Sequence, residues 1–325
     1  MVRDTVVAYT LMLAALCTSS VHVTGLGSRG VQVSCVSAVA VEPAAGAPAA
    51  LMLHGFGASA FSFRHLLQPI ADSLTNEAIS FDRPAFGCTA RPMPAKCRSW
   101  DEAIDGRNPY TLSAAVDITF AVADEFAPGA PLILFGHSAG AEVAVAAALA
   151  RPDRVKALVL IAPAVAMAPA RATQAEGFNI LSKLPFSSCA GGWLVRTVAR
   201  RAIDRGLALA WHDKSTLTEE IISGYAEPLT SAGPDVGRAL WEFTLARSGE
   251  KNAPTMSDLS RIGAPCLIIV GVNDKIVPME HCEAVARHIA GAQLVVVDQS
   301  GHLPHEERPE EVLDSIRRFL AKLSP

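Results

Sequence analysis

The residues best suited to chemistry are a serine, an aspartate and a histidine that each follow a short apolar run. Ser138 lies in the pentapeptide 136–140, GHSAG, between the apolar residues 131–135 and the alanine-rich residues 139–150. A G-x-S-x-G sequence between a strand and a helix is typical of a sharp turn that exposes the serine hydroxyl at the edge of a sheet. Glycines on either side let the strand and the helix pack closely around a strained residue. Ser138 is therefore the candidate nucleophile.

A serine hydroxyl is a weak nucleophile until a base accepts its proton and an acid orients that base. His302 follows the last predicted strand, and Asp274 follows the strand before it. The order Ser, Asp, His along the chain is the order that accompanies turns of this kind. Two simpler interpretations stay open, because Asp274 could only cap the next helix and His302 could be an ordinary loop histidine. Asp298 is too near His302 in sequence to face it, so we assign Asp274 as the orienting acid and His302 as the base.

The elements that must position these residues are predicted from apolar runs that alternate with amphipathic stretches. Residues 21–23 and 31–33 alternate around a glycine-rich turn and predict a leading hairpin. Further strands are expected at residues 49–53, 78–81, 131–135, 155–162, 266–270 and 293–297, and helices at 61–74, 110–126, 139–150, 281–289 and 309–323. Apolar strands alternating with helices predict an α/β fold, with a mostly parallel central sheet covered by helices on both faces.

The alternation stops between residues 164 and 260, where several helices separated by Gly and Pro are expected, including 217–229 and 236–247. This stretch is predicted to be an all-helical cap inserted into the sheet domain. The expected organisation is a hydrophobic targeting or anchor segment at 1–20, the first part of the core at 21–163, the cap at 164–260 and the second part of the core at 261–325.

Composition excludes several classes of protein. Half of the 325 residues are hydrophobic and 18% are charged, which allows a sizeable core and excludes global disorder. The net charge of -4 means that the chain has no excess of basic residues, so no nucleic-acid partner is expected. The seven cysteines form no C-x-x-C, which excludes a typical zinc site or disulfide framework. Cys88 and Cys97 could bridge across a loop, but isolated thiols are favoured.

The N-terminal stretch has the composition of a targeting segment. Residues 5–17 are uncharged and mostly apolar, as in the hydrophobic part of a secretory signal, although Asp4 departs from the usual positive start. An organelle transit peptide, such as one for the chloroplast, and a membrane anchor remain open alternatives. The expected location is therefore the secretory pathway, an organelle or a membrane surface, with any membrane association through this segment.

Five motifs in order resemble the alpha/beta-hydrolase superfamily: residues 54–57 (HGFG), 81–87 (FDRPAFG), 136–140 (GHSAG), Asp274 and 300–309 (SGHLPHEERP). The resemblance covers residues 31–323 and is strongest with capped members, which include carboxylesterases, carbon-carbon bond hydrolases and epoxide hydrolases. It implies the alpha/beta-hydrolase fold, with an oxyanion hole formed by the backbone N–H groups of Phe56 and Ala139. Epoxide and haloalkane hydrolases of this fold carry Asp where this chain has Ser138, so the resemblance disfavours both chemistries.

These observations predict a serine hydrolase that cleaves an ester or a related acyl compound through an acyl-enzyme. No metal or cofactor is expected, because the sequence contains no G-x-G-x-x-G, P-loop or metal-ligand spacing. Two alternatives stay open: hydrolysis of a carbon-carbon bond in a diketone-like substrate, and a small-molecule receptor of the same fold with little turnover. An enzyme would regenerate free Ser138 quickly, whereas a receptor would change its stability or its partners on binding.

The expected partner is a small, mostly apolar acyl substrate, because the predicted cap is rich in Leu, Ala, Trp and Phe. The candidate substrate contacts are His54, Trp193, Trp211, Trp241 and Phe243. The four aromatic residues of the cap either line the pocket or only pack the cap, and the sequence does not separate these interpretations. His54 and its counterpart His137 are expected to brace their loops rather than to react.

Overall fold

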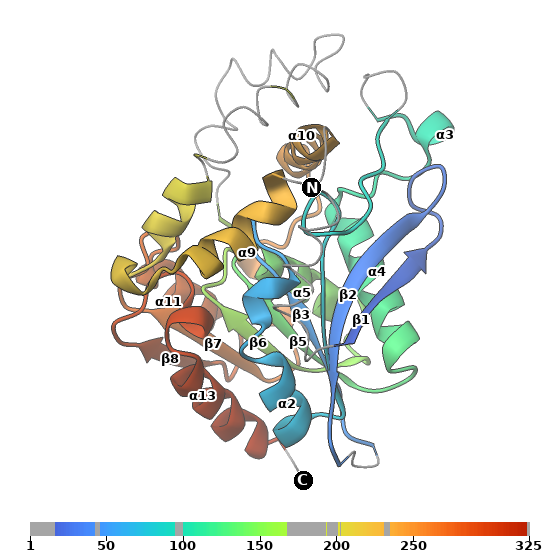
Figure 1. Cartoon of the computed structure of the whole chain (residues 1–325). Coiled ribbons are helices and arrows are strands. Elements are labelled where there is room, and N and C mark those ends of the chain that lie inside the picture. The colour runs from blue at the N-terminus through green and yellow to red at the C-terminus, as the bar shows by residue number, and fades with distance from the viewer. Residues whose placement is uncertain are drawn as a thin grey trace.

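A mostly parallel sheet forms the centre of the protein. The computed structural model describes residues 17–42, 46–94, 100–167, 193, 201, 203–230 and 235–323. The described residues form an eight-stranded sheet of order β1-β2-β4-β3-β5-β6-β7-β8 (Figure 1). Its strands are β1 (Cys17–Val23), β2 (Val31–Val39), β3 (Ala49–Leu53), β4 (Glu77–Phe81), β5 (Leu132–His137), β6 (Val155–Ile161), β7 (Cys266–Gly271) and β8 (Gln293–Val297). Strand β2 runs antiparallel to β1 and β4, and the other neighbours are parallel. The predicted fold class is confirmed.

Helices cover both faces of the sheet, so the inner strands are buried along their whole length, as β3, β5 and β7 are. One face packs against α2 (Leu67–Leu74) and α13 (Pro309–Ala321). The other face packs against α4 (Leu112–Phe126), α5 (Ala139–Ala150) and α11 (Met279–His288). The short helices α3 (Glu102–Asp105) and α12 (Pro304–Glu307) lie in connecting segments. Full burial explains why these strands are continuous apolar runs without alternation.

The predicted helix at 61–74 is two separate elements, a 3₁₀ turn η1 (Ala60–Phe63) and the helix α2. Pro69 explains the break, because proline has no N–H and its ring clashes with the carbonyl four residues earlier in a continuous helix. In α2 the proline lies in the first turn, where neither problem arises. The start of α4 is set by Thr111, whose Oγ1 accepts a hydrogen bond from Ala114 N at 3.2 Å.

The sheet begins earlier than predicted. Strand β1 starts at Cys17, four residues before the expected core boundary at residue 21, and pairs with residues 31–37 of β2. Thr18, Ser19 and Ser20 are exposed on this edge strand, where polar side chains are tolerated because the backbone supplies the pairing. The rest of the predicted targeting segment, residues 1–16, lies outside the described residues. Among the helices that the structure describes, none is long and apolar enough to cross a membrane.

A helical insertion joins β6 to β7. Its described part contains a helix over residues 203–210, η3 (Lys214–Thr216), α9 (Glu219–Thr230), α10 (Asp235–Ser248) and η4 (Ser257–Arg261). Figure 1 shows α9 and α10 above the sheet. Helix α9 approaches the core so closely at Gly224 that a Cβ there would lie 2.4 Å from the Phe61 ring. Residues 168–192, 194–200, 202 and 231–234 of the predicted cap lie outside the described residues, as does Cys97, the possible bridge partner of Cys88.

Candidate active site

Ser138 lies in a strained turn between β5 and α5. Its φ of 52° and ψ of −120° fall in a region that residues with a side chain rarely adopt. The flanking glycines are required because a Cβ on Gly136 would lie 2.5 Å from Ala141 Cα, and one on Gly140 would lie 2.0 Å from the Leu53 carbonyl oxygen. The strand and the helix therefore meet at van der Waals distance, and the turn holds Ser138 at the carboxyl end of the sheet.

Asp274 and His302, which follow β7 and β8, are hydrogen-bonded to each other. His302 Nδ1 and Asp274 Oδ2 are 2.7 Å apart, and the two side chains are only 6% and 1% exposed. The other carboxylate oxygen, Asp274 Oδ1, accepts hydrogen bonds from the backbone N–H groups of Ile276 at 2.8 Å and Val277 at 2.9 Å. Asp274 thus binds the turn before α11 and the histidine at the same time, so its contact with the start of that helix does not prevent its contact with His302.

Two buried histidines support the loops around this site. His137 Nε2 is 2.9 Å from the carbonyl oxygen of His302, and the His302 backbone N–H donates to Ala210 O of the insertion at 2.7 Å. His54 Nδ1 is 2.8 Å from Gly55 O, and its Nε2 accepts the Arg83 backbone N–H at 3.0 Å. Burial lowers the pKa of His54 and His137 well below the usual value, so both rings are neutral. Each ring thus contacts the backbone of a neighbouring loop.

The two predicted oxyanion donors belong to backbone segments next to Ser138. Ala139 is the first residue of α5, where the N–H group has no partner within the helix and the helix dipole is positive. Phe56 follows β3 in a segment that runs beside the serine, since a Cβ on Gly55 would lie 3.1 Å from Ser138 Cβ. Their role as oxyanion donors stays a prediction.

A cavity of about 420 Å³ opens onto Ser138 and His302. This volume is within the range of sites for small molecules. Its described walls contain mainly apolar side chains and no Asp, Glu, Lys or Arg. They are formed by Phe56, Gly57, Ala58, His137, Ser138, Ile203, Gly206, Leu207, Ala210, Tyr225, Leu229, Leu240, Thr244, Ile276, His302 and Leu303. The insertion contributes eight of these residues, from Ile203 to Thr244, so it closes the cavity over the serine.

Comparison with known proteins agrees with this architecture. Residues 50–315 match the model of the alpha/beta hydrolase family. The chain belongs to this family. The hydrolase is 27% identical over 268 residues to the uncharacterized hydrolase YugF of Bacillus subtilis, which covers 82% of this chain and 88% of that protein. It is 25% identical over 284 residues to the mouse sn-1-specific diacylglycerol lipase ABHD11, covering 84% of this chain and 81% of that one.

Solved structures show the same fold. A thermophilic esterase from Thermogutta terrifontis superposes on the hydrolase with a TM-score of 0.69 at 22% identity, covering 95% of this chain and 100% of the esterase. At this identity the likeness shows the fold alone.

The aromatic residues predicted as substrate contacts do not line the described cavity. Trp211 is buried and donates its Nε1–H to Thr216 Oγ1 at 3.0 Å, and Trp241 is also buried. Phe243 packs against the Phe56 ring, with centroids 5.9 Å apart. The remaining candidate, Trp193, is 70% exposed. His54, the fifth candidate, is fully buried behind the loop and is absent from the described walls.

The walls supplied by the insertion are mostly aliphatic, with Ile203, Leu207, Leu229 and Leu240 beside Tyr225. Sequence reasoning missed them because helical periodicity separates buried from exposed positions and does not separate a filled core from a cavity. Of the predicted aromatic contacts, Phe243 and Trp211 instead pack in hydrophobic clusters that contain residues of the insertion and of the core.

His305 is a third buried histidine of the hydrolase. Its burial predicts that the free energy of unfolding depends on pH. Its ring stacks on Phe63 with centroids 5.2 Å apart and lies 4.7 Å from the His137 ring. Burial lowers its pKa to about 3. Below about pH 6.5 the unfolded chain binds a proton at His305 and the folded chain does not. The contribution of His305 to the free energy of unfolding therefore falls as the pH is lowered from that value towards 3.

His305→Phe removes this titration and keeps the stacking on Phe63. Between about pH 7.5 and about pH 5, we expect the wild type to lose about 2 kcal/mol more of its free energy of unfolding than the variant loses. Urea unfolding at both pH values measures the difference. Parallel losses in the two proteins would show that His305 is protonated in the folded state as readily as in the unfolded chain.

Proposed function

We propose that this hydrolase cleaves uncharged carboxylic esters, or related acyl compounds, through an acyl-enzyme on Ser138. The observation that carries the proposal is the 2.7 Å hydrogen bond between His302 Nδ1 and Asp274 Oδ2, next to a strained serine turn. Ser138 and His302 line the same cavity, so a substrate there meets both side chains. With Nδ1–H donating to Asp274, His302 presents Nε2 as the proton acceptor.

In the proposed reaction, Ser138 Oγ attacks the ester carbonyl while His302 Nε2 takes the hydroxyl proton. The carbonyl oxygen becomes an oxyanion that accepts hydrogen bonds from the N–H groups of Phe56 and Ala139. One such donor is worth about 3 to 4 kcal/mol of transition-state stabilisation. His302 then gives its proton to the leaving alcohol. Water, activated by the same histidine, attacks the acyl-enzyme, releases the acid and returns Ser138 to its free state.

The substrate class follows from the cavity and the insertion. A charged group would lose its hydration without gaining an ion partner in the described walls, which contain no acid or base apart from the histidines. An apolar acyl chain gains from burial there. The similarity to a diacylglycerol lipase supports an ester as the bond that is cleaved. In this proposal the insertion is the cap, and it selects the acyl group while the sheet domain performs the reaction.

A panel of p-nitrophenyl esters from acetyl to dodecanoyl, with a succinyl ester as the charged member, tests the proposal. We expect kcat/KM to rise by up to about tenfold for each methylene that the cavity accommodates, and the succinyl ester to be hydrolysed poorly. Rapid, repeated turnover is expected, which a receptor with little turnover would not show. Failure to hydrolyse any ester, together with failure of a fluorophosphonate to label the protein, would overturn the proposal.

Gly206 offers a way to shorten the cavity. It lines the wall, and a Cβ placed there meets no atom within 4 Å, so a side chain can begin at this position without a clash at Cβ. We expect Gly206→Leu to shift the preference towards shorter acyl chains, lowering kcat/KM for the longest good substrate by about tenfold. Gly263→Leu is the matched control, because Gly263 also has open space at Cβ and is not part of the described walls. An unchanged order of substrates in both variants would place the acyl chain elsewhere.

A further inference from the structure

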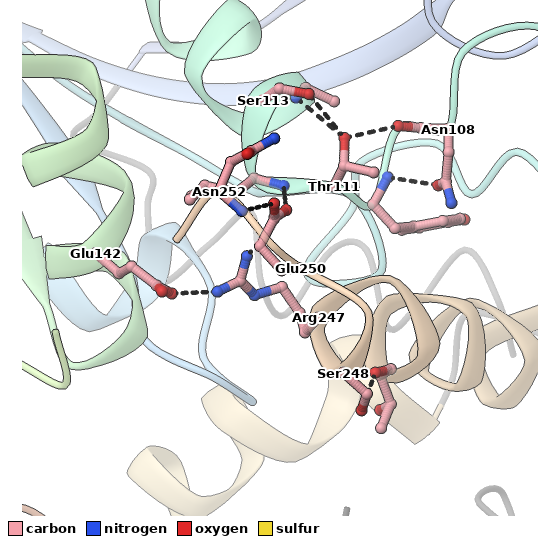
Figure 2. Close-up of polar contacts among 12 residues, drawn as sticks. Asn108, Thr111, Ser113, Glu142, Arg247, Ser248, Glu250 and Asn252 are labelled. Atoms are coloured by element: carbon pink, nitrogen blue, oxygen red, sulfur yellow. Dashed lines mark hydrogen bonds and ion pairs between the residues drawn. The ribbon is translucent and has the colours of Figure 1, made fainter. Parts of the chain in front are cut away.

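A cluster of charged side chains joins α10 of the insertion to α4 and α5 of the core. Arg247 Nη2 donates to Glu142 Oε2, and Arg247 Nη1 lies 3.6 Å from Glu250 Oε2. Figure 2 shows Arg247 between the two carboxylates. Glu250 in turn accepts the backbone N–H of Leu112, the first residue of α4, at 3.1 Å. The three charged side chains are 11–22% exposed, so water screens their attraction less than it screens that of an exposed pair.

Arg247 is linked to one side of the proposed oxyanion hole through Phe243. The two residues are four positions apart on α10 and therefore lie on the same face of that helix. The Phe243 ring packs against the Phe56 and Phe86 rings, with centroid distances of 5.9 Å and 5.0 Å. A shift of α10 would consequently move the side chain against which Phe56 packs.

Arg247 is linked to the other side of the hole through Glu142. This glutamate lies in the first turn of α5, three residues after Ala139. The ion pair therefore ties α10 to the helix end that carries the second proposed donor. Both N–H groups of the hole are thus connected to the same arginine, one through a ring contact and one through an ion pair.

A small void lies where α10 meets α5. The cavity has a volume of about 20 Å³, and the residues that line it include Ala139, Glu142, Phe243 and Arg247. Side chains around a void lack contacts on one side, so dispersion forces hold their spacing less firmly than in a filled core. The charged cluster is a described interaction that joins α10 directly to α5 at this point.

We propose that Arg247 is a positioning residue for the oxyanion hole, which it holds in shape by clamping α10 to α5 through Glu142. This inference rests on the proposed function, since it assigns the two N–H donors to catalysis. Oxyanion donors must lie within a few tenths of an ångström of their best distance and bind the transition state more strongly than the substrate. Loss of the clamp should therefore lower kcat and leave KM nearly unchanged.

Arg247→Met keeps most of the side-chain length and removes the charge. We expect kcat for a good p-nitrophenyl ester to fall about 10-fold to 100-fold, with KM within about threefold of the wild type. The affinity for a trifluoromethyl ketone, whose adduct with Ser138 places an oxyanion in the hole, should fall in parallel with kcat/KM. Arg154→Met is the matched control, because Arg154 pairs with Asp124 at 2.9 Å on the core and touches neither α10 nor the hole.

Glu142→Gln tests the clamp from the other side and replaces the arginine variant if that protein does not fold, as judged by circular dichroism. A fall in kcat of about fivefold or more is expected for Glu142→Gln, and the double variant should lose no more than Arg247→Met alone. Additive losses, or an Arg247→Met enzyme equal to the Arg154→Met enzyme, would overturn the inference. A wild type without hydrolysis or fluorophosphonate labelling would instead overturn the proposed function, so the two failures are distinguishable.

Discussion

Ser138→Ala is expected to remove nearly all ester hydrolysis, with a loss on the order of 10⁴-fold or more in kcat. The variant loses only the Oγ atom. Alanine retains the Cβ that already occupies the turn, and the backbone hydrogen bonds of Ser138 N to Ile161 O at 2.9 Å and of Ala141 N to Ser138 O at 3.0 Å do not involve the hydroxyl. The fold should therefore remain, and only the nucleophile should be missing.

Steady-state turnover of a p-nitrophenyl ester by the purified variant measures this loss, with fluorophosphonate labelling as a second readout. Ser62→Ala is a suitable control, since Ser62 is a buried serine whose Oγ donates to Ser59 O at 3.1 Å and is not part of the described cavity walls. The control should keep both turnover and labelling. Equal turnover by Ser138→Ala and wild type would remove the basis of the acyl-enzyme mechanism.

The features that sequence reasoning found are those whose pattern lies within a few consecutive residues. Strands β5 and β7 are buried on both faces, which forces continuous apolar runs, and such runs can be recognised without a structure. The serine turn likewise depends on Gly136 and Gly140, because the close approach of strand and helix excludes a side chain there. Each pattern lies within a few consecutive residues, so it can be recognised in the sequence, although the atom nearest to a Cβ on Gly140 belongs to Leu53 of β3.

The features that were missed depend on contacts between distant residues. The start of β1 at Cys17 comes from pairing with Ser37 across the hairpin, and a targeting segment has a similar composition. Glu142 and Arg247 are 105 residues apart, and nothing near either residue indicates that they meet. The residues of the cavity walls were missed for the same reason. Leu207 and Leu240 face an open space only because the helix over residues 203–210, α10 and the core meet at a distance that the local pattern does not encode.

Asp274→Asn is expected to lower kcat by about 10⁴-fold while the protein stays folded. The hydrogen bonds of Asp274 indicate how this loss of kcat arises. Asp274 Oδ1 accepts two backbone N–H groups, from Ile276 and Val277, so the single amide oxygen of asparagine would keep that position. The amide NH₂ would then face His302 Nδ1, 2.7 Å from the present Oδ2 position, and would donate to it. This arrangement favours the tautomer with a proton on Nε2, which cannot accept the proton of Ser138.

Asp298→Asn is the matched control, because Asp298 is an exposed acid four residues before His302 and is the other aspartate near it in sequence. The kcat of this control should stay within about threefold of the wild type, since a peripheral charge contributes little to the tautomer of a buried ring.

The two variants also distinguish an effect on the orientation of the His302 ring from an effect of negative charge alone. If long-range attraction for the imidazolium were the main effect, both substitutions would lower kcat by similar small factors. A full loss in Asp298→Asn with an active Asp274→Asn would assign the orienting acid to Asp298. The buried hydrogen bond predicts the opposite order, because only Asp274 touches the ring nitrogen that must keep its proton.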